Sequence, residues 1–283
     1  MPATIAIPEH TRRRREHPVP ATPVERTPRE QVSALICTRN RSDTIAAAAA
    51  SILRPDSACC ELLIIDQSTN DQTERALEPL AGDPRLRYIR TQTTGKGIAL
   101  NDGLQQANSE IVAITDDDCV VPPTWPGNQV RALASDPRIA ISYGNVIAAE
   151  HDRSAGFIPA YHVPKERVCV TMLQKLRARG IGANTVVRRS AILSLGGFDT
   201  EVGPGGKFRA CIDRDMTLRC LLAGYAVYEC PESSVLHFGF RNWEQGRKLT
   251  FDSFYGMGAS FAKPLRRGRF SALAPAGYEL MVH

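Results

Sequence analysis

Short runs of apolar residues, each closed by polar ones, alternate with stretches of helical pattern between residues 32 and 116. The apolar runs at 32–37, 61–65, 86–89 and 111–114 have the length and continuity of strands buried on both faces. Helices are expected at about 42–53, 71–80 and 95–107, the first starting at an N-cap of Ser42 or Asp43. This alternation predicts an α/β fold with a largely parallel central sheet, covered by helices on both faces.

The ends of the chain differ from its middle. Residues 1–30 hold six prolines and few large apolar residues, so we expect a disordered Pro/Arg-rich leader. The arginines at 12–15 are not followed by an apolar core, which argues against a secretory signal. The folded domain is expected at 31–240, and 241–283 forms a basic, aromatic C-terminal segment.

Composition narrows the class of protein. The chain is 43% hydrophobic and 23% charged, as in ordinary globular proteins, and it has no apolar stretch of the ~18–20 residues that span a bilayer. Its eight cysteines include no C-x-x-C pair, which favours reduced thiols and the cytoplasm.

The net charge of +5 is concentrated in the tails. Residues 32–240 hold 22 basic and 23 acidic residues, whereas 241–283 hold seven Lys or Arg against three acids. Basic tails of this kind suit an anionic membrane surface or nucleic acid, or merely aid solubility.

Polar side chains follow three of the predicted strands: Thr38 and Arg39, then Asp66, then Asp116 to Asp118. Ligands of parallel sheets bind beyond the carboxyl ends of the strands, so these side chains mark a candidate site. Three adjacent carboxylates repel one another unless a cation such as Mg²⁺ or Mn²⁺ offsets their charge. A solvated acidic turn is the alternative for such a triplet.

Further motifs follow these strand ends along the chain. Taken together and in this order, the motifs resemble those of the family two glycosyltransferases, which have the Rossmann-like GT-A fold. The motifs that carry the resemblance are 32–41, 63–71, 116–118, 182–189, 196–199, Asp213, 221–225 and 235–237. They cover about residues 31–240, which are then the GT-A domain.

The resemblance implies that residues 31–135 bind a nucleoside diphosphate sugar and residues 136–240 an acceptor. It assigns donor binding to six residues: Thr38, Arg39, Asp66, Lys96, Asp116 and Asp117. It assigns Mn²⁺ or Mg²⁺ to Asp118 and His237. Other interpretations stay open: Asp66 caps the turn at Ser68 and Thr69, Lys96 is a surface lysine in a glycine turn, and His237 is a core residue.

The same likeness implies an inverting transfer with Asp213 as the general base. The family has Glu where this chain has Ile212, so Asp215 is the reserve candidate, and ion pairing of either with Arg214 is the alternative. The glycine-rich residues 203–206 are expected to form a flap over the donor.

These observations favour a metal-dependent inverting glycosyltransferase that moves a sugar from a nucleoside diphosphate sugar to an acceptor hydroxyl. The setting it suggests is bacterial-type polysaccharide or glycolipid synthesis, with a sugar, a lipid-linked molecule or another hydroxyl compound as acceptor. We expect a cytoplasmic protein that contacts the inner face of the membrane through 241–283, and no nucleic-acid partner. The alternatives are a catalytically impaired nucleotide-sugar-binding protein, suggested by Ile212, and a nucleic-acid-binding protein that uses the tails.

Overall fold

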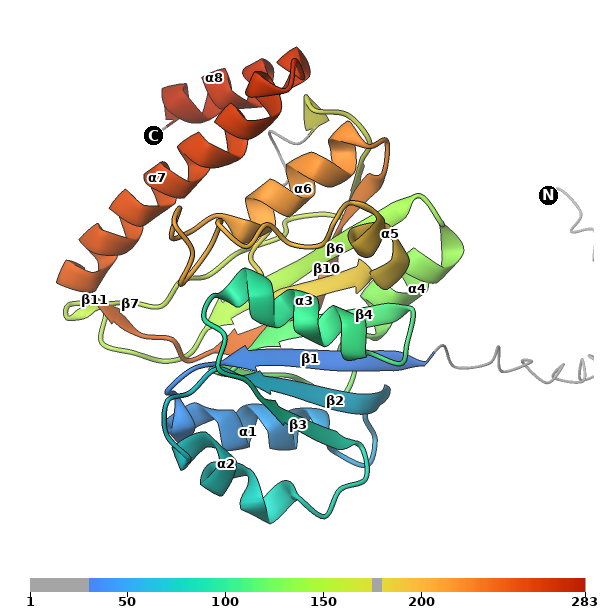
Figure 1. Ribbon diagram of the computed structural model, residues 1–283, viewed down its shortest axis with the longest axis vertical. Helices are drawn as coiled ribbons and strands as arrows, with labels where there is room; N and C mark the ends of the chain where they lie inside the picture. Colours follow the sequence, from blue (N-terminus) through green and yellow to red (C-terminus); the bar gives the residue numbers. More distant parts are fainter. Residues whose placement is uncertain (1–30, 175–179, 283) are drawn as a thin grey trace, which may run out of the picture.

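The computed structural model describes residues 31–174 and 180–282 (Figure 1). The predicted leader at 1–30 lies outside the described residues. In the first half, strands and helices alternate as the apolar pattern predicts. They are β1 (Val32–Thr38), α1 (Ser42–Ile52), β2 (Cys59–Asp66), α2 (Gln72–Leu77) with the 3-10 turn η1 (Glu78–Leu80), β3 (Leu86–Arg90), α3 (Lys96–Gln106) and β4 (Ile111–Asp116).

The second half adds longer strands and the C-terminal helices. Its elements are β5 (Cys119–Val120), α4 (Gly127–Ser135), β6 (Ile139–Ala148), β7 (Gly156–Phe157), β8 (Arg167–Cys169), β9 (Asn184–Arg188), α5 (Arg189–Ser194), α6 (Ile212–Leu222), β10 (Ala226–His237), β11 (Arg241–Asn242), α7 (Trp243–Arg266), η3 (Phe270–Ala272) and α8 (Leu273–Val282).

One sheet runs through both halves in the order β3-β2-β1-β4-β9-β6-β10-β5, and β8 pairs with β10. The pairs β1–β2, β2–β3, β1–β4 and β6–β10 are parallel. Strand β9 runs antiparallel to both β4 and β6. The predicted parallel sheet is therefore confirmed in the first half, and the second half is mixed.

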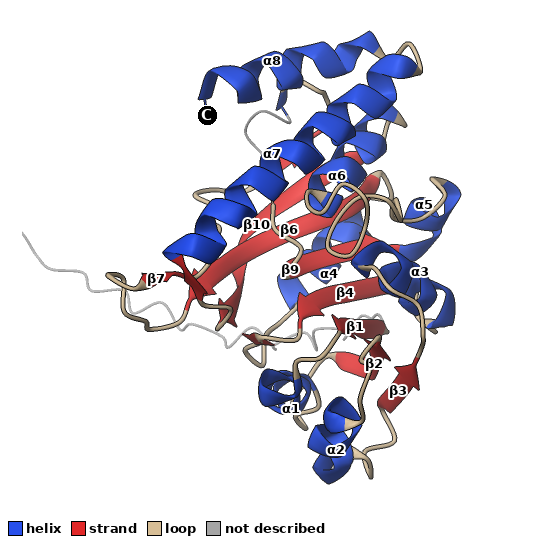
Figure 2. Ribbon diagram, turned by 60° about the vertical axis from the view of Figure 1, so that its left-hand side comes forward, coloured by secondary structure: helices blue, strands red, loops and turns tan. Residues whose placement is uncertain are grey.

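Apolar side chains cover the sheet on both faces, as predicted. One core cluster joins the sheet to α1 and α4 through residues such as Ala48 and Leu133. The other joins it to α3, α5 and α6 through residues such as Leu100, Ile192 and Met216. Figures 1 and 2 show α1 and α3 on opposite sides of β1.

The C-terminal segment is helical and packs on the rest of the chain. Met257 and Phe261 of α7 are buried against Leu218 of α6. An ion pair of 2.8 Å between Arg214 and Glu279 ties α8 to α6. Among the described residues, no helix combines the length and the hydropathy that crossing a bilayer requires.

Candidate active site

Strand pairing brings the predicted polar side chains to one edge of the sheet. Thr38 at the end of β1 lies opposite Asp66 of β2, and Cys37 lies opposite Asp116 of β4. Because β1 is parallel to both neighbours, the three strands present their carboxyl ends at the same edge. The convergence that the sequence predicts is therefore present.

The aspartate triplet is largely buried and is held by cations and a hydroxyl. The hydroxyl of Thr38 donates to Oδ2 of Asp117 at 2.7 Å. The guanidinium of Arg41 lies 3.1 Å from Asp117 Oδ1 and 2.6 Å from Asp118 Oδ2. Burial raises the pKa of Asp117 to about 6, against the lowering effect of Arg41 and Thr38.

Arg41 is a site residue that the sequence reasoning missed. It follows Thr38 by three residues and precedes the first residue of α1, within the first motif. The signal available was the repulsion of three adjacent carboxylates, which a nearby arginine offsets as a metal ion does. By contrast, the predicted donor ligand Arg39 is exposed, and no ion pair joins it to the triplet within the described residues.

Lys96 joins the triplet to Asp213. Its ammonium lies 2.5 Å from Oδ1 of Asp116. Burial disfavours the charged ammonium, but the carboxylates of Asp116 and Asp213 outweigh it and raise the pKa of Lys96. Lys96 is thus part of a charge cluster at the sheet edge and not an isolated surface lysine.

A side-chain amide fixes the loop that carries Lys96. Gln67 accepts from the backbone N–H of Gly95 at 3.1 Å and donates to the carbonyl oxygen of Gly95 at 3.2 Å. Gly95 has φ of +122°, which favours glycine. The N–H of Lys96 donates to the carbonyl of Pro204 at 2.9 Å, so the predicted flap at 203–206 rests on the start of α3.

Asp66 is fully buried, and both of its carboxylate oxygens accept hydrogen bonds. The N–H of Ser68 donates to Oδ1 at 2.8 Å, and the hydroxyl of Tyr88 donates to Oδ2 at 2.7 Å. The turn-capping interaction considered for Asp66 is therefore present. Each carboxylate oxygen can accept a second hydrogen bond, so these two contacts leave acceptor capacity for a nucleoside.

Asp213 and Asp215 lie in different surroundings. Asp213 is half-buried near Lys96 and Asp116, and its carboxylate accepts from the N–H of Gly182. A Cβ at residue 182 would lie only 2.6 Å from Oδ1 of Asp213, so this approach requires glycine. Burial raises the pKa of Asp213, while Lys96 lowers it.

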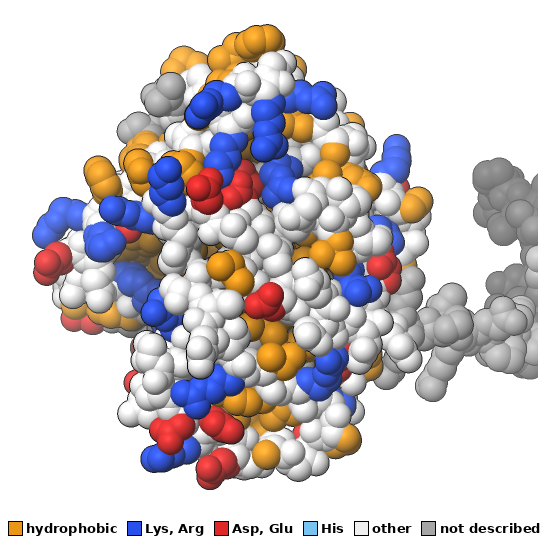
Figure 3. Space-filling model, viewed as in Figure 1, with side chains coloured by type: hydrophobic (Ala, Val, Ile, Leu, Met, Phe, Trp, Pro, Cys, Tyr) orange, Lys and Arg blue, Asp and Glu red, His pale blue; other side chains and the backbone are white. Residues whose placement is uncertain are grey.

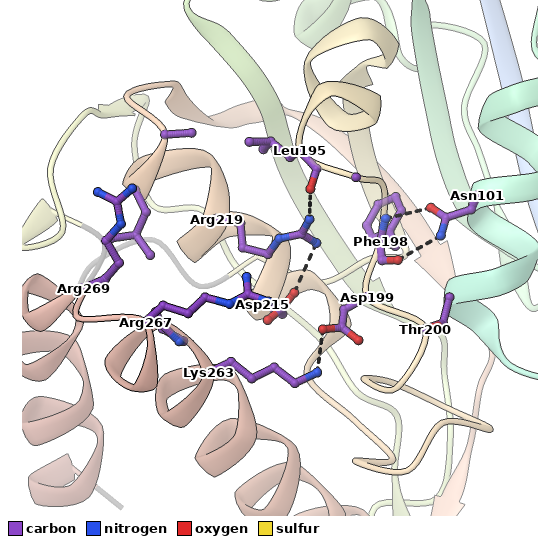
Figure 4. A pocket seen from close by; sticks show the side chains of 14 residues that line it. Asn101, Leu195, Phe198, Asp199, Thr200, Asp215, Arg219, Lys263, Arg267 and Arg269 are labelled. Carbon is purple, nitrogen blue, oxygen red and sulfur yellow. Dashed lines mark hydrogen bonds and ion pairs between the residues drawn. The ribbon is translucent and has the colours of Figure 1, made fainter.

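Asp215 is not brought to the triplet. It is buried between α6 and α7, where Arg219 lies 3.6 Å from its Oδ2 (Figure 4). Ile212, which replaces the Glu of the family, is buried in the core and packs near Gly203. Arg214 pairs with Glu279, so the alternative of an ion pair with Asp213 or Asp215 is not what these contacts show.

Asp118 and His237 form a pair that suits a metal ion. Nε2 of His237 lies 3.2 Å from Oδ1 of Asp118, and Nδ1 lies 2.7 Å from the carbonyl oxygen of Pro159. Because that carbonyl only accepts, Nδ1 carries a proton whether the ring is neutral or charged. In the neutral ring the Nε2 lone pair faces the carboxylate, an arrangement that suits a cation between them, whereas in the imidazolium Nε2 donates to the carboxylate.

The surroundings of this pair agree with that interpretation. A Cβ at Gly239 would lie 2.6 Å from Oδ2 of Asp118, so the glycine leaves space beside both side chains. Asp118, Cys119 and His237 are all buried, with potential ligand atoms within 4.8 Å of one another. Burial raises the pKa of the Cys119 thiol, so an oxygen and a nitrogen are the charged or lone-pair donors present. That set suits Mn²⁺ or Mg²⁺ when substrate oxygens complete the shell.

Charge also couples the pair. Burial would raise the pKa of Asp118, but the hydrogen bond from His237 and the charge of Arg41 lower it to about 2. Burial would likewise lower the pKa of His237, and the interaction with Asp118 raises it instead. The charges of Asp118 and His237 are therefore coupled.

A mixed α/β sheet with an aspartate triplet, a lysine and a late histidine at its edge defines a glycosyltransferase of the GT-A fold. Residues 33–195 match the family model for glycosyl transferase family 2. The chain therefore belongs to that family, as its motifs predict.

Curated relatives and solved structures agree with this assignment. The chain is 25% identical over 178 residues to the poly-beta-1,6-N-acetyl-D-glucosamine synthase of Staphylococcus epidermidis, covering 61% of this chain and 43% of the relative. It thus spans less than half the length of that relative. Among solved structures it is similar to a mannosyltransferase from Pyrobaculum calidifontis in complex with GDP-Man and Mn²⁺ (22% identity, TM-score 0.60, 88% of this chain and 70% of the other). It is also similar to TarS of S. aureus (16% identity, TM-score 0.58, 74% and 60%).

Proposed function

We propose that the chain is a metal-dependent, inverting glycosyltransferase that moves a sugar from a nucleoside diphosphate sugar to an acceptor hydroxyl. The observation that carries the proposal is the meeting of Asp213, Lys96 and Asp116 at the sheet edge that also holds the Asp118–His237 pair. A carboxylate base, a cation for phosphate and a metal pair are the groups that this reaction needs.

The donor lies along the carboxyl ends of β1, β2 and β4 in this proposal. Thr38, Arg39 and Asp66 contact the nucleoside, and Asp116 and Asp117 orient the ribose and the diphosphate. Lys96 supplies positive charge to the diphosphate, since its ammonium is held charged between two carboxylates.

Asp118 and His237 are the residues that would hold Mn²⁺ or Mg²⁺. Such an ion would neutralise charge on the departing nucleoside diphosphate. The structure of the P. calidifontis relative with GDP-Man and Mn²⁺ supports this assignment by similarity of fold.

Asp213 acts as general base. Its carboxylate accepts the proton of the acceptor hydroxyl while the hydroxyl oxygen forms a bond to the anomeric carbon from the face opposite the leaving group. The bond between that carbon and the diphosphate oxygen breaks, so the configuration inverts and the nucleoside diphosphate leaves. Burial raises the pKa of Asp213, which makes its carboxylate a better proton acceptor.

The biological setting follows from the relatives. The matched synthase is described as making a poly-N-acetylglucosamine, and TarS was also solved with UDP-GlcNAc. We therefore propose polysaccharide or glycolipid synthesis, with a sugar or a lipid-linked hydroxyl compound as acceptor.

The surface of α7 supports contact with the inner face of the membrane. Phe251, Phe254 and Tyr255 are 64%, 43% and 44% exposed and follow an i, i+3, i+4 spacing, and the exposed Arg247 lies on the same side of the helix. Aromatic and basic residues on one helical face suit an anionic lipid interface. Phe251→Ser should weaken co-sedimentation with anionic liposomes, and higher salt should weaken it further. Equal binding to neutral liposomes would argue against this contact.

One experiment tests the proposed activity against its rival. The full chain is incubated with UDP-GlcNAc or GDP-mannose and sugar acceptors, with Mn²⁺ or with EDTA, and release of nucleoside diphosphate is measured. Release that needs Mn²⁺, with a product of inverted configuration, supports the proposal. Donor binding without transfer or hydrolysis would favour the impaired binding protein that Ile212 suggests.

A further inference from the structure

A cavity with charged lining residues lies apart from the sheet edge, between α6, the end of α7 and the loop that follows α5. Its volume is about 570 Å³, within the roughly 300–1,000 Å³ of small-molecule sites. Six of its fourteen lining residues are charged: Arg219, Lys263, Arg267, Arg269, Asp199 and Asp215 (Figure 4). Figure 3 shows Lys and Arg side chains gathered around a small acidic patch on the upper part of the face that is also seen in Figure 1.

Two of the four cations are already paired and build the walls of the cavity. Lys263 lies 2.5 Å from Oδ2 of Asp199. Arg219 donates to the backbone carbonyls of Leu195 and Gly197 and lies 3.6 Å from Asp215. These contacts fix the cavity without using the other two cations.

Arg267 and Arg269 have no such partners. Their backbone N–H groups both donate to the carbonyl of Pro264, which fixes the turn after α7. Within residues 31–174 and 180–282, no ion pair or hydrogen bond engages either guanidinium. The cavity therefore presents two unpaired guanidinium groups, and its lining as a whole carries a net charge of +2.

A buried carboxylate oxygen gives an independent sign of a ligand. Asp215 is only 3% exposed, it lines the cavity, and its Oδ2 accepts no hydrogen bond among the described residues. Buried polar atoms are almost always hydrogen-bonded, and the 3.6 Å separation from Arg219 is too long for a hydrogen bond, so this oxygen can accept from a donor on a ligand. A hydroxyl on the ligand, including a P–OH group, supplies one.

We propose that this cavity binds a phosphate group through Arg267 and Arg269. Guanidinium groups match the oxygen geometry of phosphate and bind it by charge-assisted hydrogen bonds. The positive net charge suits an anion, and the monoanion of a phosphate monoester keeps one P–OH that donates to Asp215. The site is separate from the donor site, because Asp213 faces the sheet edge while Asp215 faces the cavity.

The phosphate has two possible sources, a lipid headgroup and free phosphate. Phe270 and Leu273 follow Arg269 in the chain and are 68% and 54% exposed. Apolar side chains beside a phosphate site suit the acyl chain of a lipid phosphate, which is the source we expect.

The test is a binding measurement on the full chain that needs no transferase activity or metal. Inorganic phosphate and monomeric dihexanoyl phosphatidic acid are titrated separately by calorimetry in EDTA. The test variant is Arg267→Ser with Arg269→Ser, and its matched control is Arg131→Ser with Arg153→Ser. The control pair is also exposed and changes the charge equally, but it lies outside the C-terminal segment and does not line the cavity.

The proposal predicts saturable binding that falls ~10-fold or more in the test variant and stays within about twofold of wild type in the control. Tighter binding of the phosphatidic acid identifies a lipid source, and equal binding of both identifies free phosphate. No saturable binding of either probe, or an equal loss in both variants, would overturn the proposal. Circular dichroism establishes that both variants remain folded.

Discussion

Nε2 of His237 lies 3.2 Å from Oδ1 of Asp118, while Nδ1 of the same ring is held by the carbonyl of Pro159. The second contact places a proton on Nδ1, so Nε2 either donates to the carboxylate as part of an imidazolium or, in the neutral ring, faces it with a lone pair. The neutral form is the arrangement that a metal ion between the two side chains needs, and it is the basis of the proposed metal site.

Asp118→Asn should abolish the gain in donor affinity that Mn²⁺ provides, because an amide is a poor ligand for a hard cation. We expect the donor affinity of the variant, measured by calorimetry in the presence of Mn²⁺, to be at least ~10-fold lower than that of the wild type. The donor affinity measured in EDTA should change little. Cys119→Ala is the matched control, since its thiol lies in the same cluster but is held neutral. A Mn²⁺ effect that survives Asp118→Asn would remove Asp118 from the metal site.

Gln67 holds Lys96 in place through the peptide groups of Gly95, so its effect on donor binding should be indirect. Gln67→Met keeps the volume but removes the hydrogen bonds of the amide to Gly95 and to the hydroxyl of Thr93. We expect about 1–3 kcal/mol less free energy of unfolding and weaker donor binding. Lys96→Met should weaken donor binding more than Gln67→Met does. It should change the conformation of the loop at Gly95 less when no donor is bound. Unchanged donor affinity in Gln67→Met would show that the loop keeps its position without this amide.

Much of the first half follows from the sequence, because solid apolar runs identify buried strands and their polar ends identify one edge of the sheet. The position of strand β9 in the sheet could not be predicted in this way. It inserts antiparallel between β4 and β6, a pairing that local pattern does not specify. Likewise, the motif residues Asp213 and Asp215 are equally acidic in the sequence, and only the packing of α6 directs one to the sheet edge and the other to α7.

Arg41 and Asp66 show the same limit in the site itself. The sequence places both near the triplet, but the ion pairs of Arg41 and the hydrogen bonds that occupy Asp66 depend on side-chain positions. Which of several neighbouring polar groups pair with one another depends on where the fold places their side chains.

Glu61 should make stability depend on pH. It is buried at the start of β2. Burial would raise its pKa, but hydrogen bonds from Ser33, Asn108 and Arg87 lower it. A lowered folded-state pKa stabilises the fold above the unfolded pKa of ~4.3, and this contribution is lost as pH falls below that value. Glu61→Gln should therefore cost about 1–3 kcal/mol near pH 7 and less near pH 3, by urea unfolding. A difference that grows toward acid pH would contradict this account.

The transfer rate should depend on the ionisation of Asp213. Transfer needs the carboxylate form, so kcat should fall as pH drops through the pKa of Asp213, which burial raises above its usual ~3.9. The acid limb of kcat is therefore expected above pH ~4, with donor saturation verified at each pH. A kcat that stays flat down to pH 4 would point to another base.

The most direct test of the proposed mechanism compares Asp213→Asn with Asp215→Asn, two identical changes on one helix that face different surroundings. Asparagine keeps the shape of the side chain but cannot take the acceptor proton, so Asp213→Asn should lower kcat ~10²–10⁴-fold with near-normal donor affinity. Asp215→Asn should change kcat far less, because its carboxylate lines the cavity between α6 and α7. An active Asp213→Asn enzyme, or an inactive Asp215→Asn enzyme beside it, would contradict the assignment of the base.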